Sequence, residues 1–538
     1  MSEIRMDDEK VFLKQNVLME PLFNQWYAWP HLIPPASAAM YIAHLQLAIM
    51  RSYIKSPQIH AAAVKNPAML GGPFIDFEGK RVEEVKALMH KTIAEQARMI
   101  ELADAIKALD DLLRKEARGF SLESLYEKVP SMLKGYVELV YDLNNHPSIR
   151  FIEGLLYTSP FYDVSSQSIL LSLIEQDHRS FVLSTPRLAD ETHLQISVPF
   201  NHEVIDELFK MRSAPQTFGY IKDALGVETG DEQLFRTFFT TEQHHKASSS
   251  DRKYDGESVR IRYFSHASVL LETRDICIFT DPSVSYEYDG CIPRYTFMDL
   301  PDVIDYVLIT HAHQDHVMLE MLLQLRHKIK NIVVPKNSGG NLADPSLKMI
   351  FKQLGFRNVL EIDEMEAVEF EGGTITGLPF FGEHSDLNIR SKTAFLVQLA
   401  GHSIVCAADS NNLEPMLYEH IQQAIGDIDV MFIGMECDGA PLSWVYGPLL
   451  TQPFDRKMDQ SRRLSGSNFL KAFDLISRTR CRQVYVYAMG QEPWLNHIMC
   501  LTYSEDSPQI TESDELVEEC RKRGIIAERL FGQKEMFL

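Results

Sequence analysis

Cysteine is scarce in this chain and unevenly distributed. The 538 residues include seven cysteines, all at or after Cys277, and none belongs to a C-x-x-C pair. An odd, scattered set argues against both a disulfide framework and a zinc ribbon, and is typical of reduced thiols in a cytoplasmic protein. The one-sided distribution also indicates that the two halves of the chain differ in character.

Long apolar runs and an excess of positive charge are also missing. No run approaches the length of about 20 apolar residues that spans a membrane, and the polar, acidic start MSEIRMDDEK is typical of neither a signal peptide nor a transit peptide. The net charge of −22 argues against a nucleic-acid partner, because phosphate binding needs a basic face. The segment DRKMDQSRR, with Lys457, Arg462 and Arg463, could form a local basic patch, although a solvated surface is the simpler interpretation.

The length predicts two or three domains, and the first half is expected to be mixed and helix-rich. Residues 81–118 contain no glycine or proline, which predicts one long helix or two nearly continuous ones. An apolar stripe follows this stretch at Val82, Val85, Met89, Ile93, Ile100, Leu109 and Leu113. Core packing is the simpler interpretation of the stripe, and a subunit interface is the alternative that motivates a homodimer. Residues 180–188 and 193–200 have the composition of strands.

A polar, charged stretch at residues 240–258 is the best candidate for a linker. We therefore expect an N-terminal mixed α/β domain at residues 1–245, used for dimerisation and partner docking, and a catalytic domain at residues 255–538. His244 and His245 lie in this stretch, and a solvated pair is far simpler than a metal site.

The second half is rich in short apolar segments typical of strands. We predict strands at 259–273 (with a turn), 276–282, 305–310, 331–335, 367–378 (with a turn), 393–399, 403–409, 430–435 and 483–490. Hairpins come first and strands alternating with helices follow, which predicts two sheets covered by helices on the outside. The expected fold class is thus α+β or α/β, with a four-layer α/β/β/α sandwich after the helix-rich first half.

A compact group of metal-binding side chains directly follows one predicted strand. The segment THAHQDH contains His311, His313, Asp315 and His316 within six residues, at a strand end where loops carry functional sites. Alternate residues of this loop can face one metal ion, and the last two can face a second. A chance grouping of polar loop residues is the alternative, and it is improbable for four potential ligands at one strand end.

This H-x-H-x-D-H pattern resembles the motif of the metallo-β-lactamase superfamily, and the chain is similar to that superfamily from about residue 259 onward. The resemblance implies that Asp281 accepts a hydrogen bond that orients a ligating histidine. It also implies that Asp409, at the end of a predicted strand, bridges two metal ions, and that His497 in GQEPWLNH is the last ligand.

One further ligand is expected in the segment LPFFGEHSDL, where Glu383 and His384 compete. Hydrolases of this superfamily use histidine here, and His384 would complete a set of five histidines and two aspartates that suits two zinc ions. Glu383 would give four histidines and three carboxylates. The additional hard, negative oxygen donor favours iron and stabilises its higher oxidation state.

The wider sequence resembles the diiron β-hydroxylases of nonribosomal peptide and antibiotic biosynthesis, the family of the chloramphenicol-pathway amino acid β-hydroxylase. The segments NQWYAWPHLIPP, KNPAMLGGPFID and GEHSDL carry this resemblance, which extends over the whole chain. It places Glu383 at the position of the family's glutamate and His384 beside the site. One iron would then be held by His311, His313 and Glu383, the other by Asp315, His316 and His497, with Asp409 bridging.

The resemblance implies a non-haem diiron monooxygenase whose catalysis depends on Glu383 and Asp409. Its cofactors would be two iron ions, with O2 as co-substrate. The electrons would come from an external donor, because no G-x-G-x-x-G nucleotide motif follows a strand. The substrate would be an amino acid attached as a phosphopantetheine thioester to a carrier protein of a nonribosomal peptide synthetase.

Three alternative functions agree less well with the sequence. A dizinc hydrolase of a thioester, lactone or phosphodiester shares every motif except the glutamate. A flavodiiron O2 or NO reductase normally carries H-x-E-x-D-H, where this chain has His313, and a flavodoxin-like segment is missing. A non-catalytic interaction protein would have no need for so complete a set of metal ligands.

Overall fold

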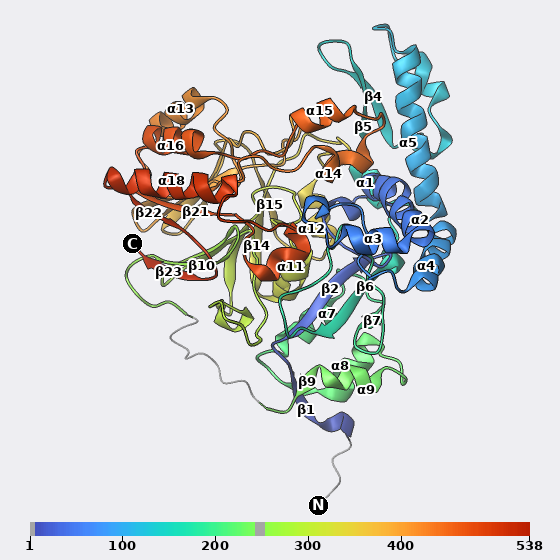
Figure 1. Cartoon of the computed structure of the whole chain (residues 1–538), viewed down its shortest axis with the longest axis horizontal. Coiled ribbons are helices and arrows are strands. Elements are labelled where there is room, and N and C mark those ends of the chain that lie inside the picture. The colour runs from blue at the N-terminus through green and yellow to red at the C-terminus, as the bar shows by residue number, and fades with distance from the viewer. Residues whose placement is uncertain (1–5, 243–252) are drawn as a thin grey trace, which may run out of the picture.

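The computed structural model describes residues 6–242 and 253–538. The elements of the N-terminal half lie together on one side of the molecule, and those of the C-terminal half lie on the other (Figure 1). His244 and His245 fall outside the described residues, as does most of the predicted linker. The domain boundary at residues 245–255 therefore stays a prediction.

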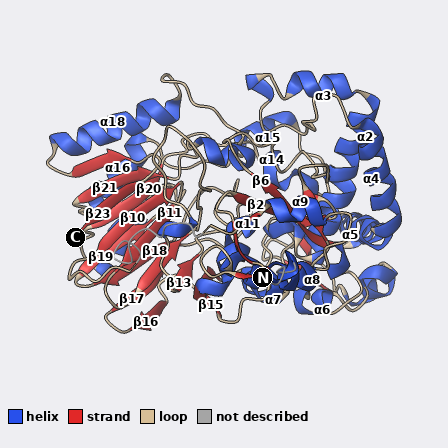
Figure 2. Ribbon diagram, turned by 90° about the horizontal axis from the view of Figure 1, so that it is seen from below, coloured by secondary structure: helices blue, strands red, loops and turns tan. Residues whose placement is uncertain are grey.

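The C-terminal half contains two seven-stranded sheets packed face to face (Figure 2). The first contains, in spatial order, β15 (Val359–Ile362), β14 (Ile329–Pro335), β13 (Ile304–Leu308), β12 (Cys277–Thr280), β11 (Ser268–Glu272), β10 (Arg260–Ser265) and β23 (Lys534–Phe537). The second contains β16 (Ala367–Phe370), β17 (Gly373–Leu378), β18 (Ala394–Leu399), β19 (His402–Cys406), β20 (Val430–Gly434), β21 (Gln483–Tyr487) and β22 (Ile526–Arg529). Every strand predicted in this half is present.

Both sheets change from antiparallel hairpins to parallel strands along the chain. In the first sheet the change occurs at β12, which pairs antiparallel with β11 and parallel with β13. In the second it occurs at β19, which pairs antiparallel with β18 and parallel with β20. The carboxyl ends of neighbouring parallel strands meet at one edge of each sheet, and the metal-binding motif follows β13 at such an edge.

Apolar packing holds the sandwich together. Side chains such as Ile278 of the first sheet and Phe395 of the second fill the space between the sheets. The outer face of the second sheet packs against α13 (Pro415–Ile425), α16 (Phe469–Arg478) and α18 (Pro508–Lys522). The first sheet is covered by α11 (Leu319–Leu325) and α12 (Leu347–Gln353). The predicted four-layer α/β/β/α order is confirmed.

The N-terminal half is mixed and helix-rich, as predicted. It contains a sheet of β3 (Trp26–Tyr27), β2 (Val17–Phe23), β6 (Gln167–Leu173) and β7 (Leu194–Ile196), a smaller sheet of β8 (Gln216–Thr217), β1 (Lys10–Leu13) and β9 (Phe239–Thr240), and a hairpin of β4 (Val137–Tyr141) and β5 (Pro147–Phe151). Its helices are α1 (Pro35–Tyr41), α2 (Leu47–Lys55), α3 (Pro57–Ala63), α4 (Val82–Glu95), α5 (Ala97–Glu116), α6 (Glu153–Tyr157), α7 (Glu203–Lys210), α8 (Phe218–Leu225) and α9 (Glu232–Thr237). One continuous apolar core joins this half to α11 and α12 of the sandwich.

The apolar stripe predicted between residues 81 and 118 lies on α4 and α5, which are separated only at Gln96. Val85, Leu109 and Leu113 are buried in the core of the N-terminal half, and only Ile93 of the stripe is exposed. The stripe therefore serves mainly to pack the chain on itself. It does not support a subunit interface, and the homodimer stays a prediction.

One strand prediction in the N-terminal half was wrong. Residues 180–188 form an irregular loop, because their backbone groups bond to separate elements rather than to one neighbouring strand. Val182 donates its N–H to the carbonyl of His497 at 2.9 Å, and Arg187 donates to the carbonyl of Gln25 at 2.7 Å. Of residues 193–200, only Leu194–Ile196 is a strand. All seven cysteines are unpaired, as expected.

Helices of the described residues are all too short or too polar to cross a lipid bilayer.

Candidate metal centre

The candidate ligands lie on loops that follow strands at one end of the sandwich. His311, His313, Asp315 and His316 follow β13, and Asp409 follows β19. The sheet edge formed by the carboxyl ends of parallel strands is a common location for ligand sites. The structure brings all of the predicted ligands together except His497.

The first group of ligand atoms belongs to His311, His313 and Glu383, all buried and within 4.8 Å of one another. Nδ1 of His313 lies 2.9 Å from Oε1 of Glu383 and 3.2 Å from Nε2 of His311. The second oxygen of Glu383 is buried without a hydrogen-bond partner. Glu383, and not its neighbour His384, is thus the residue of GEHSDL that joins the group.

The second group belongs to Asp315, His316 and His266. Nε2 of His266 lies 3.0 Å from Oδ2 of Asp315, and Nε2 of His316 lies 3.6 Å from the same oxygen. His266 was not predicted to be a ligand. It occupies the turn between β10 and β11, within the segment FSHASV, and a polar imidazole in an otherwise apolar hairpin was the available sign.

Asp409 lies between the two groups. Its Oδ2 is 2.8 Å from Nε2 of His316 and 3.6 Å from Nε2 of His311. A glycine gives this carboxylate its space, since a Cβ on Gly434 of β20 would come within 2.6 Å of Oδ1 of Asp409. This is the position that a carboxylate shared by two metal ions needs.

The other nitrogen of each motif imidazole meets a fixed partner, which orients the ring. Nδ1 of His316 lies 2.8 Å from Oδ2 of Asp281, the role predicted for this aspartate. Nδ1 of His311 lies 3.0 Å from the hydroxyl of Thr310, and Nε2 of His313 lies 2.9 Å from the hydroxyl of Tyr446. Each ring therefore turns its remaining nitrogen toward the cluster.

Several residues at or next to the candidate ligands have strained backbone conformations. His266, Asp281, Glu383 and Ala408 have φ values of 46°, 34°, 64° and 47°, in the left-handed region that non-glycine residues rarely adopt. Such conformations cost free energy and persist only where the surrounding structure fixes them. Here they lie at or beside the candidate ligands.

The side chains present fit a pair of cations. Nε2 of His316 and Oε2 of Glu383 are buried and make no hydrogen bond of normal geometry, although Nε2 of His316 lies 2.8 Å from Oδ2 of Asp409. Burial lowers the pKa of His313 to about 4, which leaves its ring neutral and able to ligate. Burial also disfavours a charge on His316, but the carboxylates of Asp409 and Asp315 outweigh it and raise its pKa. These carboxylates thus favour positive charge at the centre, and the three acidic ligands offer the hard oxygen donors that iron accepts.

His384 lies beside the ligands. Its ring stacks on that of His313, with 4.6 Å between the ring centroids and 23° between the planes. It is buried, and its Nε2 has no hydrogen-bond partner. His384 belongs to neither group of ligand atoms. Its ring instead packs against the ring of the ligand His313.

His497 occupies a different environment. Its Nε2 accepts a hydrogen bond from Nη1 of Arg179 at 2.9 Å, and Oε2 of Glu320 is 3.9 Å away. Burial, together with the charges of Arg179 and Arg187, keeps the pKa of His497 well below its usual value. In this neutral ring the lone pair of Nε2 is already used. His497 therefore lies in the contact between the two halves of the chain, outside the ligand groups.

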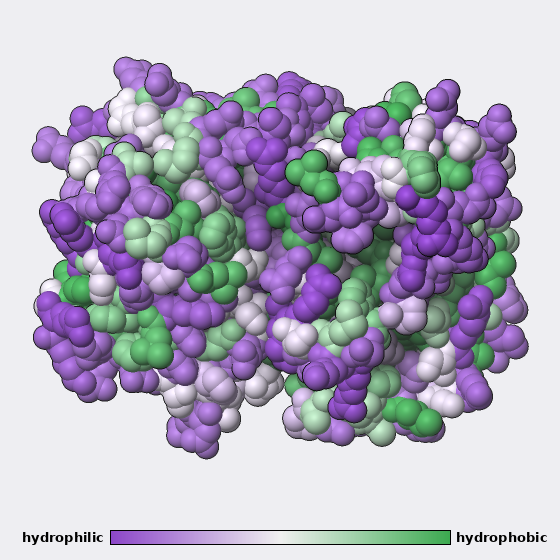
Figure 3. Space-filling model, turned by 90° about the horizontal axis from the view of Figure 1, so that it is seen from above, coloured by the Kyte–Doolittle hydropathy of each residue, from purple (hydrophilic) through white to green (hydrophobic). Residues whose placement is uncertain are grey.

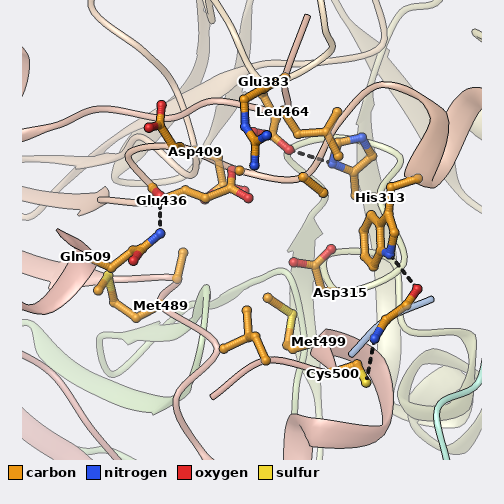
Figure 4. Close-up of a pocket in the computed structure, with 18 of the residues that line it drawn as sticks. His313, Asp315, Glu383, Asp409, Glu436, Leu464, Met489, Met499, Cys500 and Gln509 are labelled. Carbon is orange, nitrogen blue, oxygen red and sulfur yellow. Dashed lines mark hydrogen bonds and ion pairs between the residues drawn. The ribbon is translucent and has the colours of Figure 1, made fainter. Parts of the chain in front are cut away.

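A cavity of about 350 Å³ opens beside the ligands and is lined by both halves of the chain. The carboxyl groups of Glu383 and Glu436 point into it from one side, and Met489 and Met499 lie across from them (Figure 4). Glu436, which follows β20, was not predicted; burial and the nearby Glu383 carboxylate raise its pKa well above the usual value. Further lining residues are Leu70, Gly71, Trp444, Arg463, Leu464 and Tyr503.

The chain is similar to known proteins over almost its whole length. Residues 12–243 match the model of the diiron non-heme beta-hydroxylase N-terminal domain, and residues 278–440 match that of the beta-lactamase superfamily domain. Over 535 residues the chain is 38% identical to 4-amino-L-phenylalanyl-[CmlP-peptidyl-carrier-protein] 3-hydroxylase of Streptomyces venezuelae, covering 98% of this chain and 99% of that protein.

The solved structures agree with the sequence comparison. The crystal structure of CmlA, a diiron beta-hydroxylase from Streptomyces venezuelae, matches with a TM-score of 0.92 and 36% identity over 99% of this chain and 100% of that one. A mutant of CmlA matches with a TM-score of 0.90 and 36% identity, over 98% and 100% of the two chains. Because the similarity includes the N-terminal half and is not confined to the metallo-β-lactamase-type sandwich, this chain belongs to the diiron non-haem β-hydroxylase family.

Proposed function

We propose that this enzyme hydroxylates the β carbon of an amino acid attached through a phosphopantetheine thioester to a carrier protein of a nonribosomal peptide synthetase. The whole-length similarity to a hydroxylase whose name gives an aminoacyl group on a peptidyl carrier protein carries this proposal. The cavity supports it, because the cavity reaches His313, Asp315 and Glu383 and has room for an aminoacyl group.

We assign the seven iron ligands from the distances within the cluster. His311, His313 and Glu383 would hold one iron, and His266, Asp315 and His316 the other, with Asp409 shared. This assignment keeps every residue predicted from the sequence except His497, which His266 replaces. The ligand set still contains four histidines and three carboxylates.

When loaded with iron, the centre would supply O2 activation: with two electrons from an external donor and two protons, one oxygen atom would enter the C–H bond and the other would leave as water. The chain's own residues position the substrate and exclude water. Trp444, Met489 and Met499 give the cavity apolar walls beside the ligands. Tyr446 and Thr310 hold the rings of His313 and His311 in place, so the ligands are preorganised.

Two narrower predictions accompany this function. A cytoplasmic location is expected from the unpaired cysteines. A homodimer is expected from the family resemblance alone, since the stripe on α4 and α5 is occupied by core packing.

Mass spectrometry of a loaded carrier protein tests the proposal. Incubation with the iron-loaded enzyme, O2 and a chemical reductant should add the mass of one oxygen atom to the carrier-bound amino acid, with little change to the free amino acid. Release of the amino acid by thioester hydrolysis, without oxygen insertion, would instead support a hydrolase. Equal rates on free and carrier-bound amino acid would refute the carrier requirement.

A further inference from the structure

A basic segment at residues 455–463 has no role in the metal centre. It contains Arg456, Lys457, Arg462 and Arg463 and only two acidic residues, in a chain whose net charge is −22. Both acidic side chains are occupied by hydrogen bonds that fix the local structure. Asp455 accepts from the N–H of Met458 at 2.8 Å, and Asp459 accepts from the N–H and the hydroxyl of Ser443 at 2.8 and 2.9 Å.

The four basic side chains have no carboxylate partner within the part of the chain that the structure describes. Arg462 donates from Nε to the carbonyl of Ser385 at 2.9 Å, and Arg463 donates from Nη1 to Oε1 of Gln460 at 3.0 Å. Nε of Arg463 is buried without a partner. Guanidinium groups hold several donors, so most of this donor capacity is left for a ligand.

The basic segment forms part of the cavity wall. After α15 (Arg456–Ser461) the chain runs antiparallel to residues 440–442, with Leu442 donating to the carbonyl of Arg462 at 2.9 Å and Leu464 to that of Ala440 at 2.8 Å. Arg463 and Leu464 consequently line the same cavity that reaches Glu383. α15 lies in the upper part of the molecule in Figure 1, next to α14 (Ser443–Tyr446), to which Asp459 is hydrogen-bonded through Ser443.

The face of the molecule seen from above mixes hydrophilic and apolar side chains (Figure 3). Figure 3 views the molecule from above, and apolar side chains lie there in small groups between hydrophilic ones. Recognition on this face would therefore depend on charged and polar contacts more than on a large apolar patch.

We infer that this basic rim, defined as Arg456, Lys457, Arg462 and Arg463, binds the phosphodiester of the carrier protein's phosphopantetheine arm. The inference rests on the proposed function, since the arm must place its thioester end near the irons. Its phosphodiester lies at the opposite end, where the arm joins the carrier, and Arg463 offers a guanidinium group in the wall of the same cavity. Arg463 binds the phosphate directly, whereas Arg456 and Lys457 attract it from the surface of an otherwise acidic enzyme.

Binding of two small probes to the iron-loaded full chain tests this inference. 4′-Phosphopantetheine and pantetheine differ only in the phosphate, so the ratio of their dissociation constants reports recognition of that group. We expect 4′-phosphopantetheine to bind about tenfold more tightly, as charge-assisted hydrogen bonds would give. Arg463→Gln should abolish this preference and leave the affinity for pantetheine unchanged.

Lys352→Gln is the matched control, because Lys352 is exposed on α12 and does not line the cavity. It should retain the full preference for the phosphorylated probe. Equal affinity of the two probes for the unaltered enzyme would overturn the inference. So would a preference that survives Arg463→Gln, or one that inorganic phosphate at the same concentration removes completely.

Kinetics on the loaded carrier separate this inference from the proposed function. The double variant R456E/K457E should raise KM for the loaded carrier about tenfold without changing kcat, and should weaken the dependence of KM on ionic strength. An unchanged KM would refute the basic rim while hydroxylation by the unaltered enzyme upholds the proposed function. If the unaltered enzyme inserts no oxygen into any loaded carrier, the proposed function itself fails.

Discussion

Arg179 of the N-terminal half donates a hydrogen bond from Nη1 to Nε2 of His497, at 2.9 Å, and so uses the lone pair that a metal ion would need. The same guanidinium forms ion pairs with Glu20 at 2.6 Å and with Glu320 of α11 at 2.7 Å. His497 therefore belongs to a buried polar contact between the two halves of the chain.

The last iron ligand can be identified by metal content. His266→Ala should reduce iron from about two ions to about one per chain, because it removes a donor next to Asp315 and His316. His497→Ala should keep both, since its Nε2 faces Arg179. Elemental analysis of both variants, purified in parallel, measures the difference. Loss of iron from the His497 variant alone would restore the ligand set predicted from the sequence.

Alanine variants of the adjacent residues Glu383 and His384 should also differ in iron content. Glu383→Ala should lose about one iron per chain and all O2 reactivity, because its carboxylate belongs to a ligand group. His384→Ala should keep both irons and lose only the ring that stacks on His313. The iron content and the visible spectrum after reduction and exposure to O2 report the outcome. The reverse result would favour the hydrolase-type ligand set.

Gly434 should be required for the bridging carboxylate. In Gly434→Ala the new Cβ would lie 2.6 Å from Oδ1 of Asp409 and 2.8 Å from the carbonyl of Ala408, so the Asp409 carboxylate must move. We expect reduced iron content and a loss of about 1–3 kcal/mol in the free energy of unfolding.

Gly230→Ala is the control for this substitution, since its Cβ would meet no atom within 4 Å. Its iron content and thermal unfolding midpoint should match those of the unaltered protein. Full iron occupancy in Gly434→Ala would show that Asp409 does not need its present position.

Glu20 should make the free energy of unfolding depend on pH over a defined acidic range. Burial favours the protonated form, but the charges of Arg187 and Arg179 outweigh burial and lower the pKa of Glu20 from 4.5 to about 2. Because the folded-state pKa is the lower one, the stabilisation is complete above pH 4.5 and is lost as the pH falls toward 2. The shift corresponds to about 3 kcal/mol at neutral pH.

Glu20→Gln tests this pH dependence in metal-free protein, where iron release cannot contribute. Its thermal unfolding midpoint should lie below that of the unaltered protein at pH 7, and the difference should shrink between pH 4.5 and 2. A difference that is constant over this range would mean that the carboxylate is not charged in the folded protein. His146→Gln is a suitable control, because His146 is exposed and its ring pairs with the nearby Asp142 on the hairpin of β4 and β5.

Several features of this protein follow from the sequence alone because they depend on neighbouring residues. The motif from His311 to His316 is contiguous, so its position after an apolar strand fixes its place at a sheet edge. Short apolar segments predicted the strands of the sandwich, since each strand must bury at least one face between the two sheets. Glu383 was chosen over His384 only through a family resemblance, because adjacent residues have no difference in spacing.

Other features were decided by tertiary structure, because they join residues that are far apart in the chain. His266 reaches Asp315 only once the β10–β11 turn packs against the loop after β13, and its place in an apolar hairpin does not show which residue it will face. His497 lies outside the ligand groups because a loop of the N-terminal half places Arg179 in contact with it. This contact joins segments that are far apart in the chain. The sequence shows which side chains are able to bind a metal ion. Folding decides which of these side chains meet in one place and which of their lone pairs are not used by hydrogen bonds.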